Sequence, residues 1–406
     1  MKIVHINCNA APIGGASIAM LRLHEALLKN GVESLVVCPY DPVVPESLQW
    51  PQGVRKRVVQ FLSKAQNAVL KLFYGRAYTI NFIPRGIASY VNRLHPDIVH
   101  LHWLGADTIS LEEIRKIKAP VVWSLHDLWP MLGVDAYPKN NWYKSGYPKT
   151  ALWVDRWVWS RKRAAIKTSR ISPIVASQWL LGEAKASLAF AGQAAYYVPL
   201  ALDASFFEGG EPLSLANSDK GKFTVLFGAT GGTGNSIKGF DRLIGALDYL
   251  GAEAKANLRI VVFGTAEQDL RVSDVPVHFV GKVASDALIP VYQAADVFAF
   301  PSRYETCGQV KLEALACGLP VIAFDEAACA EEIVHQKTGW VAQAGNLADF
   351  AKGIEWAYAL WSAPTKLEKC AGAARASMAQ AHTPKGVAQS LINVYTRVLE
   401  TSGRTP

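Results

Sequence analysis

Short apolar runs alternate with amphipathic stretches along the first half of the chain. The runs are rich in β-branched residues and bounded by turn residues, which is typical of buried parallel strands. They comprise Lys2–Asn7, Ser34–Cys38, Asp97–Trp103, Pro120–Leu125, Ile174–Ala176 and Ala194–Val198. After the first run, the Gly14-Gly15 turn opens a helical pattern that continues to Lys29.

The second half repeats this alternation. An amphipathic helix is expected over Gly239–Leu250, and the predicted strands are Phe223–Gly228, Leu258–Gly264, Val277–Val280, Asp296–Pro301 and Leu319–Phe324. Strands alternating with helices predict an α/β protein with two doubly wound, Rossmann-like domains. Ligands of such sheets bind beyond the carboxyl ends of the strands, so we expect the two domains to face a cleft.

The domain boundaries follow from where the alternation pauses. We predict domains at residues 1–200 and 201–382, with Pro199–Phe207 and the polar stretch Gly209–Lys222 as the linker. Thr383 offers a capping hydroxyl and Pro384 suits the first helical position, so a helix begins there. This C-terminal helix, within residues 383–406, could pack back on the first domain or on the second.

The composition narrows the class of protein. Of the 406 residues, 50% are hydrophobic and 19% charged, which excludes a disordered or fibrous chain. Six scattered cysteines favour a reduced, cytoplasmic protein over a disulfide scaffold or a zinc module. The N-terminus lacks the apolar stretch of a signal peptide, and no apolar run reaches the roughly 18 residues of a spanning helix. We expect a soluble protein that is at most peripheral on the inner face of the cell membrane.

The formal net charge of +8 is unevenly distributed. Residues 47–96 contain eight basic residues and no acidic one. Residues 1–200 carry 24 basic and 12 acidic groups, whereas residues 201–406 carry 18 and 22. This asymmetry suggests a different partner for each half.

The most informative motif runs from Pro301 to Val321. It predicts the end of a strand, a short loop, a helix that a glycine terminates, and then a further strand. The helix begins near Gly308, so the amides of Gly308, Gln309 and Val310 point toward the strand ends. Unpaired amides and the positive end of the helix dipole hold phosphate groups. Glu313 lies about a turn into the helix and can reach a diol such as ribose, whereas Glu305 lies on the preceding loop.

This motif resembles the donor site of the retaining glycosyltransferases of the GT-B fold, especially glycosyltransferase family 4 of the bacterial polysaccharide type. In that family, two glutamates separated by seven residues, as Glu305 and Glu313 are, mark the donor site. The resemblance implies that Glu313 binds the nucleotide ribose and that Glu305 lies beside the transferred sugar and its reacting carbon. The alternative for Glu305 is a cap on the helix.

A lysine follows the first predicted strand of the second half, in Ile237-Lys238-Gly239-Phe240. A cation at a helix start is mildly unfavourable, which favours a binding role over an ordinary solvated lysine. The resemblance implies that Lys238 neutralises the donor diphosphate. The family usually adds an upstream arginine, but Ala229–Ile237 contains no basic residue, so the diphosphate would depend on Lys238 and backbone amides.

Two further motifs in the first half match the family. It uses a glycine pair such as Gly14-Gly15 to let backbone approach the donor phosphate or the acceptor, although any tight strand-to-helix turn needs glycine. His126, in Ser124-Leu125-His126-Asp127, resembles the active-site histidine that contacts the donor sugar. A core histidine that bonds to backbone is the alternative.

The pair His100 and His102 would share one face of a strand, as metal ligands do. No third ligand follows at a plausible spacing, and no Asp-x-Asp triplet occurs in the chain. We therefore expect neither a bound metal nor another cofactor.

Two basic and aromatic stretches are candidates for the acceptor side. Val54–Tyr74 forms one apolar helical stripe flanked by lysines and arginines, which suits an anionic membrane surface or, equally, a helix whose stripe faces the core. Trp153–Lys167 mixes tryptophans with basic residues that could serve lipid headgroups, sugar stacking or nucleic acid, or lie in the core. Related enzymes that elongate lipid-linked sugars often dock through a basic first domain, which favours the membrane.

These observations predict a metal-independent, retaining glycosyltransferase. Its expected partners are a nucleotide sugar and a glycan or lipid-linked acceptor, with an anionic membrane surface meeting the basic half and no nucleic acid. Two other hypotheses stay open. One is a GT-B sugar-nucleotide epimerase or phosphorylase, and the other is a basic nucleic-acid-binding protein with a nucleotide-sensing domain.

Overall fold

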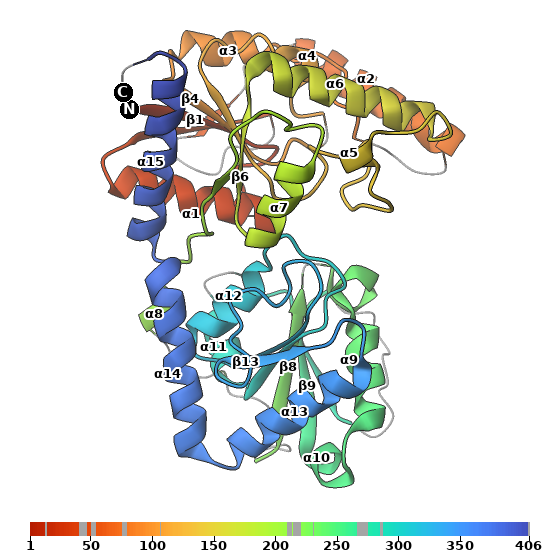
Figure 1. Cartoon of the computed structure of the whole chain (residues 1–406), viewed down its shortest axis with the longest axis vertical. Coiled ribbons are helices and arrows are strands. Elements are labelled where there is room, and N and C mark those ends of the chain that lie inside the picture. Colours follow the sequence, from red (N-terminus) through yellow and green to blue (C-terminus); the bar gives the residue numbers. More distant parts are fainter. Residues whose placement is uncertain are drawn as a thin grey trace. The chain divides into compact units, whose positions relative to one another are not determined.

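A computed structural model describes residues 1–12, 14–39, 47–49, 54–74, 79–105, 107–208, 213, 221–229, 231–265, 275–284 and 287–404. Two compact units make up the chain (Figure 1). The first consists of Met1–Ala201 together with Lys385–Pro406, and the second is Leu202–Pro384.

The first unit is built on a parallel seven-stranded sheet in the order β3-β2-β1-β4-β5-β6-β7. Its strands are β1 Lys2–Ile6, β2 Glu33–Cys38, β3 Ser47–Gln49, β4 Ile98–Leu101, β5 Val121–Ser124, β6 Ser172–Val175 and β7 Tyr196–Tyr197. The strand order reverses between β1 and β4, which is the usual ligand position in a doubly wound sheet. The sequence predicts these strands apart from β3.

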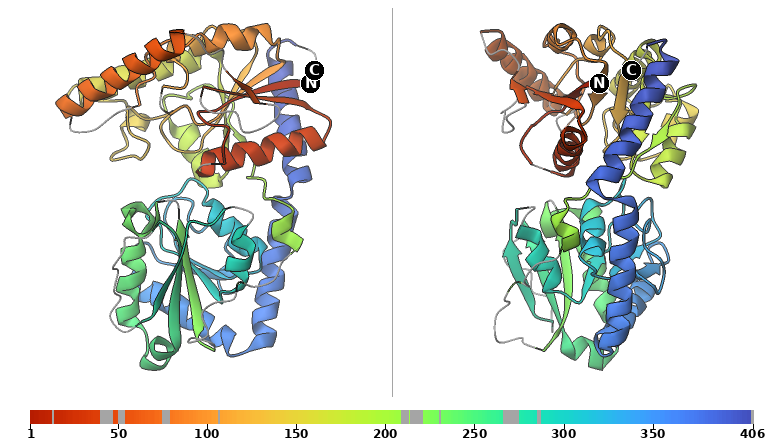
Figure 2. Two further views of the ribbon diagram at one scale, coloured as in Figure 1. Left: turned by 180° about the vertical axis from the view of Figure 1, so that it is seen from behind. Right: turned by 90° about the vertical axis from the view of Figure 1, so that its left-hand side faces the viewer.

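Helices cover both faces of this sheet, with α1 and α15 on one face and α3, α4 and α6 on the other (Figures 1 and 2). The helices are α1 Gly15–Lys29, α2 Val54–Tyr74, α3 Ile87–Arg93, α4 Leu111–Ile114, α5 Trp142–Ser145, α6 Trp153–Ser169, α7 Gln178–Ala186 and α15 Pro384–Thr401.

The C-terminal helix α15 packs against the first unit. Its buried residues Val387, Leu391 and Tyr395 share one core cluster with Ile3 of β1 and Val122 of β5. The Tyr395 hydroxyl also lies 2.7 Å from Nδ1 of His100, so the last helix is tied to the middle of the sheet by a buried hydrogen bond.

The second unit repeats the architecture with a parallel six-stranded sheet in the order β10-β9-β8-β11-β12-β13. Its strands are β8 Phe223–Ala229, β9 Leu258–Gly264, β10 Val277–Gly281, β11 Val297–Phe300, β12 Val321–Phe324 and β13 Gly339–Ala342. Its α-helices are α8 Ser205–Glu208, α9 Phe240–Ala246, α10 Ala252–Asn257, α11 Leu288–Gln293, α12 Gln309–Ala316, α13 Leu347–Trp361 and α14 Pro364–Ala381. The helix predicted to reach Leu250 ends at Ala246 and continues as a 3-10 turn, Leu247–Tyr249.

Helix α2 has the predicted bounds, and most of its described apolar side chains face solvent. Phe61 is 71% exposed and Leu72 81%, and Val58 and Leu62 are exposed as well. Leu70 is buried in a small cluster with Val154 and Val158 of α6. The views of Figure 2 place α2 along the periphery of the unit.

We predict that Leu391→Ala lowers the free energy of unfolding of the first unit by about 2–5 kcal/mol, because it opens a cavity under α15. Chemical denaturation followed by tryptophan fluorescence measures this, since nine of the twelve tryptophans lie in the first unit. Arg397→Ala, at an exposed position of the same helix, is the control and should change stability by less than about 0.5 kcal/mol. Equal effects of the two changes would contradict the observed packing.

Candidate active site

The centre of the candidate site is an ion pair at the carboxyl ends of β8 and β11. Nζ of Lys238, in the 3-10 turn Ser236–Lys238 that precedes α9, lies 2.7 Å from Oε1 of Glu305. The Ser302 hydroxyl donates to the same carboxylate oxygen at 3.1 Å. Both partners keep some exposure, 20% for Lys238 and 12% for Glu305, so a ligand can reach them. The pair lies where the strand order of this sheet reverses, as ligand sites do in this fold.

Two glycines allow these loops to come together. Gly239 has φ 72°, and a Cβ there would lie 2.1 Å from the carbonyl oxygen of Pro301. Gly308 has φ 83°, and a Cβ there would lie 2.7 Å from the Phe300 ring. Both positions combine a left-handed backbone with a close neighbour, so a side chain would push the two loops apart.

Helix α12 begins directly after Gly308, and Gln309 and Val310 are its first residues. First-turn amides have no partner within their own helix, so these amides and the helix dipole favour an anion here. Lys311 ties this helix to the segment Ala328–Glu332. Its buried Nζ donates to the carbonyls of Ala328 and Glu331 and pairs with Glu332 at 2.7 Å.

Glu313 is held inside the second unit. It is 2% exposed, and its carboxylate accepts hydrogen bonds from the Tyr292 hydroxyl at 3.0 Å and from Gln309 at 3.2 Å. The bond from Tyr292 does not follow from the sequence, because Tyr292 belongs to α11, whereas Gln309 lies one turn before Glu313 on the same helix. Glu313 and Glu305 lie on either side of the helix start, and the ribose role of Glu313 stays a prediction.

Two arginines lie near this site that sequence reasoning missed. Arg242 of α9 pairs with Glu326 at 2.8 Å, and its guanidinium lies over the Phe324 ring. Arg303 pairs with Asp241 and donates to the Ser236 carbonyl. Neither belongs to the stretch before Lys238 in which the family has its arginine. The signals that the sequence offers are a cation three residues after Gly239, Arg242, and another directly after Ser302, Arg303.

In the first unit, the predicted glycines lie at the start of α1. Gly14 is the N-cap with φ 80°, and Gly15 is the first helical residue. Asn7, which the sequence analysis did not single out, ties this turn together. Its amide nitrogen donates to Ser17 of α1, and its oxygen accepts from the backbone of Trp103 after β4.

His126 follows the end of β5 and is partly exposed. Its Nε2 lies 3.1 Å from Nδ1 of the buried His102. Burial lowers the pKa of His126 to about 4, so the ring is neutral near pH 7. Burial also raises the pKa of the neighbouring Asp127 to about 6.

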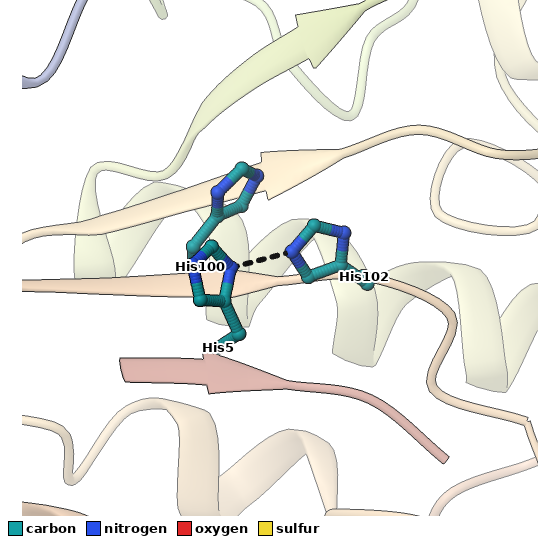
Figure 3. A group of neighbouring side chains, drawn as sticks. All are labelled: His5, His100 and His102. Carbon is teal, nitrogen blue, oxygen red and sulfur yellow. Dashed lines mark hydrogen bonds between the residues drawn. The ribbon is translucent and has the colours of Figure 1, made fainter. Parts of the chain in front are cut away.

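His100 and His102 do have a third histidine beside them, which corrects the premise of the sequence analysis. His5 of β1 pairs in register with His100, and one ring nitrogen from each of the three lies within 4.8 Å of the others (Figure 3). His5 lies in the first strand, so the missing member comes from strand pairing and not from spacing along the chain. Burial lowers the pKa of His5 to about 3 and those of His100 and His102 well below normal.

The stretch Trp153–Lys167 lies in α6, and much of it is used inside the unit. Lys162 is fully buried and donates to the carbonyls of Trp129 and Gly133. Arg161 pairs with Glu112 and lies over the Trp157 ring. None of the helices in the described part of the chain has the length and apolarity to cross a membrane.

Profiles of two protein families match the chain. The profile described as Glycosyltransferase Family 4 matches residues 13–171, and that described as Glycosyl transferases group 1 matches residues 224–359. The D-inositol 3-phosphate glycosyltransferase of Rhodococcus erythropolis is 35% identical over 28% of this chain and 26% of its own. The sulfoquinovosyl transferase of Arabidopsis thaliana is 27% identical over 65% of this chain and 50% of its own. The matched regions thus span about half or less of the length of these curated relatives.

Solved structures share the fold over almost the whole chain. The sucrose-phosphate synthase of Thermosynechococcus elongatus has a TM-score of 0.69 at 18% identity, covering 98% of this chain and 99% of its own. Anabaena HepE, solved with UDP and glucose, has a TM-score of 0.64 at 18% identity, covering 98% and 100%. Two Rossmann-like units with a site at the strand ends define the GT-B fold. Together with the two family profiles, this places the chain in the glycosyltransferases of the family 4 type.

The buried histidines predict how the stability of the first unit depends on pH. Four histidines have lowered pKa values in the folded unit: His5, His100, His102 and His126. Below about pH 6.5 these side chains therefore bind protons in the unfolded chain but stay neutral in the folded unit. The raised pKa values of the buried carboxyl groups of Asp107 and Asp127 act in the opposite direction, but they are two groups against four.

We therefore expect the thermal unfolding temperature of the first unit to decrease as the pH is lowered from about 7 to about 5. His126→Asn should flatten this fall, because it removes one of the groups. His335→Asn, at an exposed position of the second unit, is the control and should not. An unfolding temperature that stays constant or increases as the pH is lowered would contradict the neutral state of these histidines.

Proposed function

We propose that this protein is a retaining glycosyltransferase that moves a sugar from a nucleoside-diphosphate sugar to an acceptor hydroxyl. The observation that carries the proposal is the Lys238–Glu305 pair beside the start of α12, within the region matched by the group 1 profile. The second unit then holds the donor, and the chain supplies the positive charge itself, with no metal or other cofactor.

Lys238 and the first amides of α12 would face the diphosphate. As the bond between the sugar carbon and the phosphate oxygen breaks, its electron pair moves to that oxygen, and these donors stabilise the charge. The acceptor hydroxyl attacks the same face of the sugar and passes its proton to the leaving phosphate oxygen. Glu305 orients the sugar or supports the positive charge that develops on its ring.

The remaining predicted residues complete this assignment. Glu313 would bind the ribose, Gly14 and Gly15 would let backbone approach the donor phosphate or the acceptor, and His126 would contact the transferred sugar. HepE of Anabaena has been solved with UDP-glucose, which supports a nucleoside-diphosphate sugar as the class of donor.

The first test is a screen of nucleotide sugars for thermal stabilisation, followed by transfer assays with the donor found. Lys238→Met and Glu305→Gln should each lower kcat about 100- to 1,000-fold, because each removes a charge that the transition state uses. Lys282→Met, at an exposed lysine of the same unit, is the matched control and should keep normal turnover.

Two results would overturn the proposal. Near-normal transfer by both the Lys238 and the Glu305 variant would show that this ion pair is not the active site. Epimerisation or hydrolysis of the donor without any acceptor would point to a sugar-nucleotide epimerase or phosphorylase on the same fold.

We further propose that the acceptor is a glycan or lipid-linked intermediate at an anionic membrane surface, reached through α2. Its exposed Phe61, Leu62 and Leu72 can enter the interface while the exposed Lys64 and Lys71 remain at the headgroups. Each such cation contributes about 1 kcal/mol near an anionic surface. We propose the inner face of the cell membrane as this surface.

Phe61→Ser combined with Leu72→Ser should strongly reduce sedimentation with vesicles that contain anionic phospholipid. Tyr249→Ser, at an aromatic residue of the second unit that is 58% exposed, is the control and should sediment as the unchanged protein does. Binding should weaken with added salt and be lost on neutral vesicles. Equal binding to neutral vesicles would contradict an electrostatic surface.

A further inference from the structure

Three histidines form a hydrogen-bonded chain from the edge of the first unit into its core. Nε2 of His126 lies 3.1 Å from Nδ1 of His102, and Nε2 of His102 lies 2.9 Å from Nδ1 of His5. His126 is partly exposed, whereas His102 and His5 are 2% and 0% exposed. Figure 3 shows the inner bond of this chain, with His100 beside it.

A metal ion held by His5, His100 and His102 would break this arrangement. His100 already uses both ring nitrogens, toward the Tyr395 hydroxyl at 2.7 Å and toward the Ser124 hydroxyl at 2.7 Å. His5 and His102 use one nitrogen each for the bond between them. A divalent ion would have to displace these bonds and bring two positive charges into a site without solvent. The hydrogen bonds therefore favour neutral rings over a metal centre.

The protons of the chain can be counted. Three neutral imidazoles carry three ring protons, and the two bonds between the rings take two of them. The third proton lies at one end, either on Nδ1 of His126 or on Nε2 of His5. Since each bond has one donor and one acceptor, the choice at one end sets the tautomer of all three rings.

The buried end decides between the two arrangements. Nε2 of His5 has no hydrogen-bond partner among the described residues. A proton there would be a buried N–H group without an acceptor, which is rare in proteins, whereas an unfilled lone pair is tolerated more often. The proton therefore belongs at the other end, on Nδ1 of His126.

We infer that His5 and His102 are positioning residues that fix His126 as the Nδ1–H tautomer, so that it offers a hydrogen-bond donor and no base to its ligand. Resting on the proposed function, this ligand is a hydroxyl or phosphate oxygen of the nucleotide sugar. His126 then holds an oxygen atom in place and takes no proton from the acceptor, which leaves that proton to the leaving phosphate.

Nitrogen-15 NMR of the histidine rings tests this in the free protein, without a substrate. Signals of the nine histidines are assigned by single substitutions, and each ring reports which nitrogen carries its proton. We expect protonated Nδ1 and unprotonated Nε2 for His126, His102 and His5. Protonated Nε2 in His126 or His5 would overturn the inference, as would loss of the ring signals to zinc added in equal amount.

Two variants separate positioning from folding. His5→Leu removes the donor to His102, so the His126 signals should shift toward a mixture of tautomers. In His5→Asn the side-chain amide can replace Nδ1, so His126 should keep the spectrum of the unchanged protein. Unchanged His126 signals in His5→Leu would overturn the inference, and if that variant does not fold, the spectrum of the unchanged protein still decides it. Activity of the Lys238 and Glu305 variants tests the proposed function independently.

Discussion

In both sheets the chain leaves the two central strands toward opposite faces, and this reversal determines where chemistry can occur. No crossover connection covers the carboxyl ends of a strand pair at such a point, so the loops there are free to carry polar groups. In the second unit the loops after β8 and β11 bring Lys238 to Glu305. In the first unit the loops after β1 and β4 are joined by the hydrogen bond from the Trp103 backbone to Asn7, and β5 adds His126 beside His102.

Burial adds a second constraint, because a charge away from water needs a partner. The second unit satisfies it with ion pairs, Lys238 with Glu305 and Lys311 with Glu332. The first unit satisfies it at its histidines by keeping the rings neutral and bonded to one another. In the proposed donor site, a lysine already held by a carboxylate would lose little side-chain freedom when a diphosphate binds, so the ion pair would also preorganise the site.

The sequence predicts most strands of the fold because β-branched runs between turn residues are strong local signals. It misses β3, which is three residues long at a sheet edge, and β13, whose Gly-Trp-Val-Ala segment has little β-branched character. The sequence groups Glu305, Gly308 and Glu313 around one helix start because their spacing along the chain is local, and the structure has that helix start. Tyr292 and His5 were missed because they reach the sites through helix packing and strand register, which a single sequence does not encode locally.

The surplus positive charge of the first half has different uses along the chain. In α6 much of the positive charge is used inside the unit, because Lys162 donates hydrogen bonds to buried carbonyls and Arg161 forms an ion pair with Glu112. In α2 the described lysines are exposed, beside apolar side chains that the core does not cover. A surface that attracts anions needs charges that are not already paired, and one that enters a lipid layer also needs free apolar groups. Both conditions meet on α2, which is why we propose this helix, and not α6, as the surface that contacts a membrane.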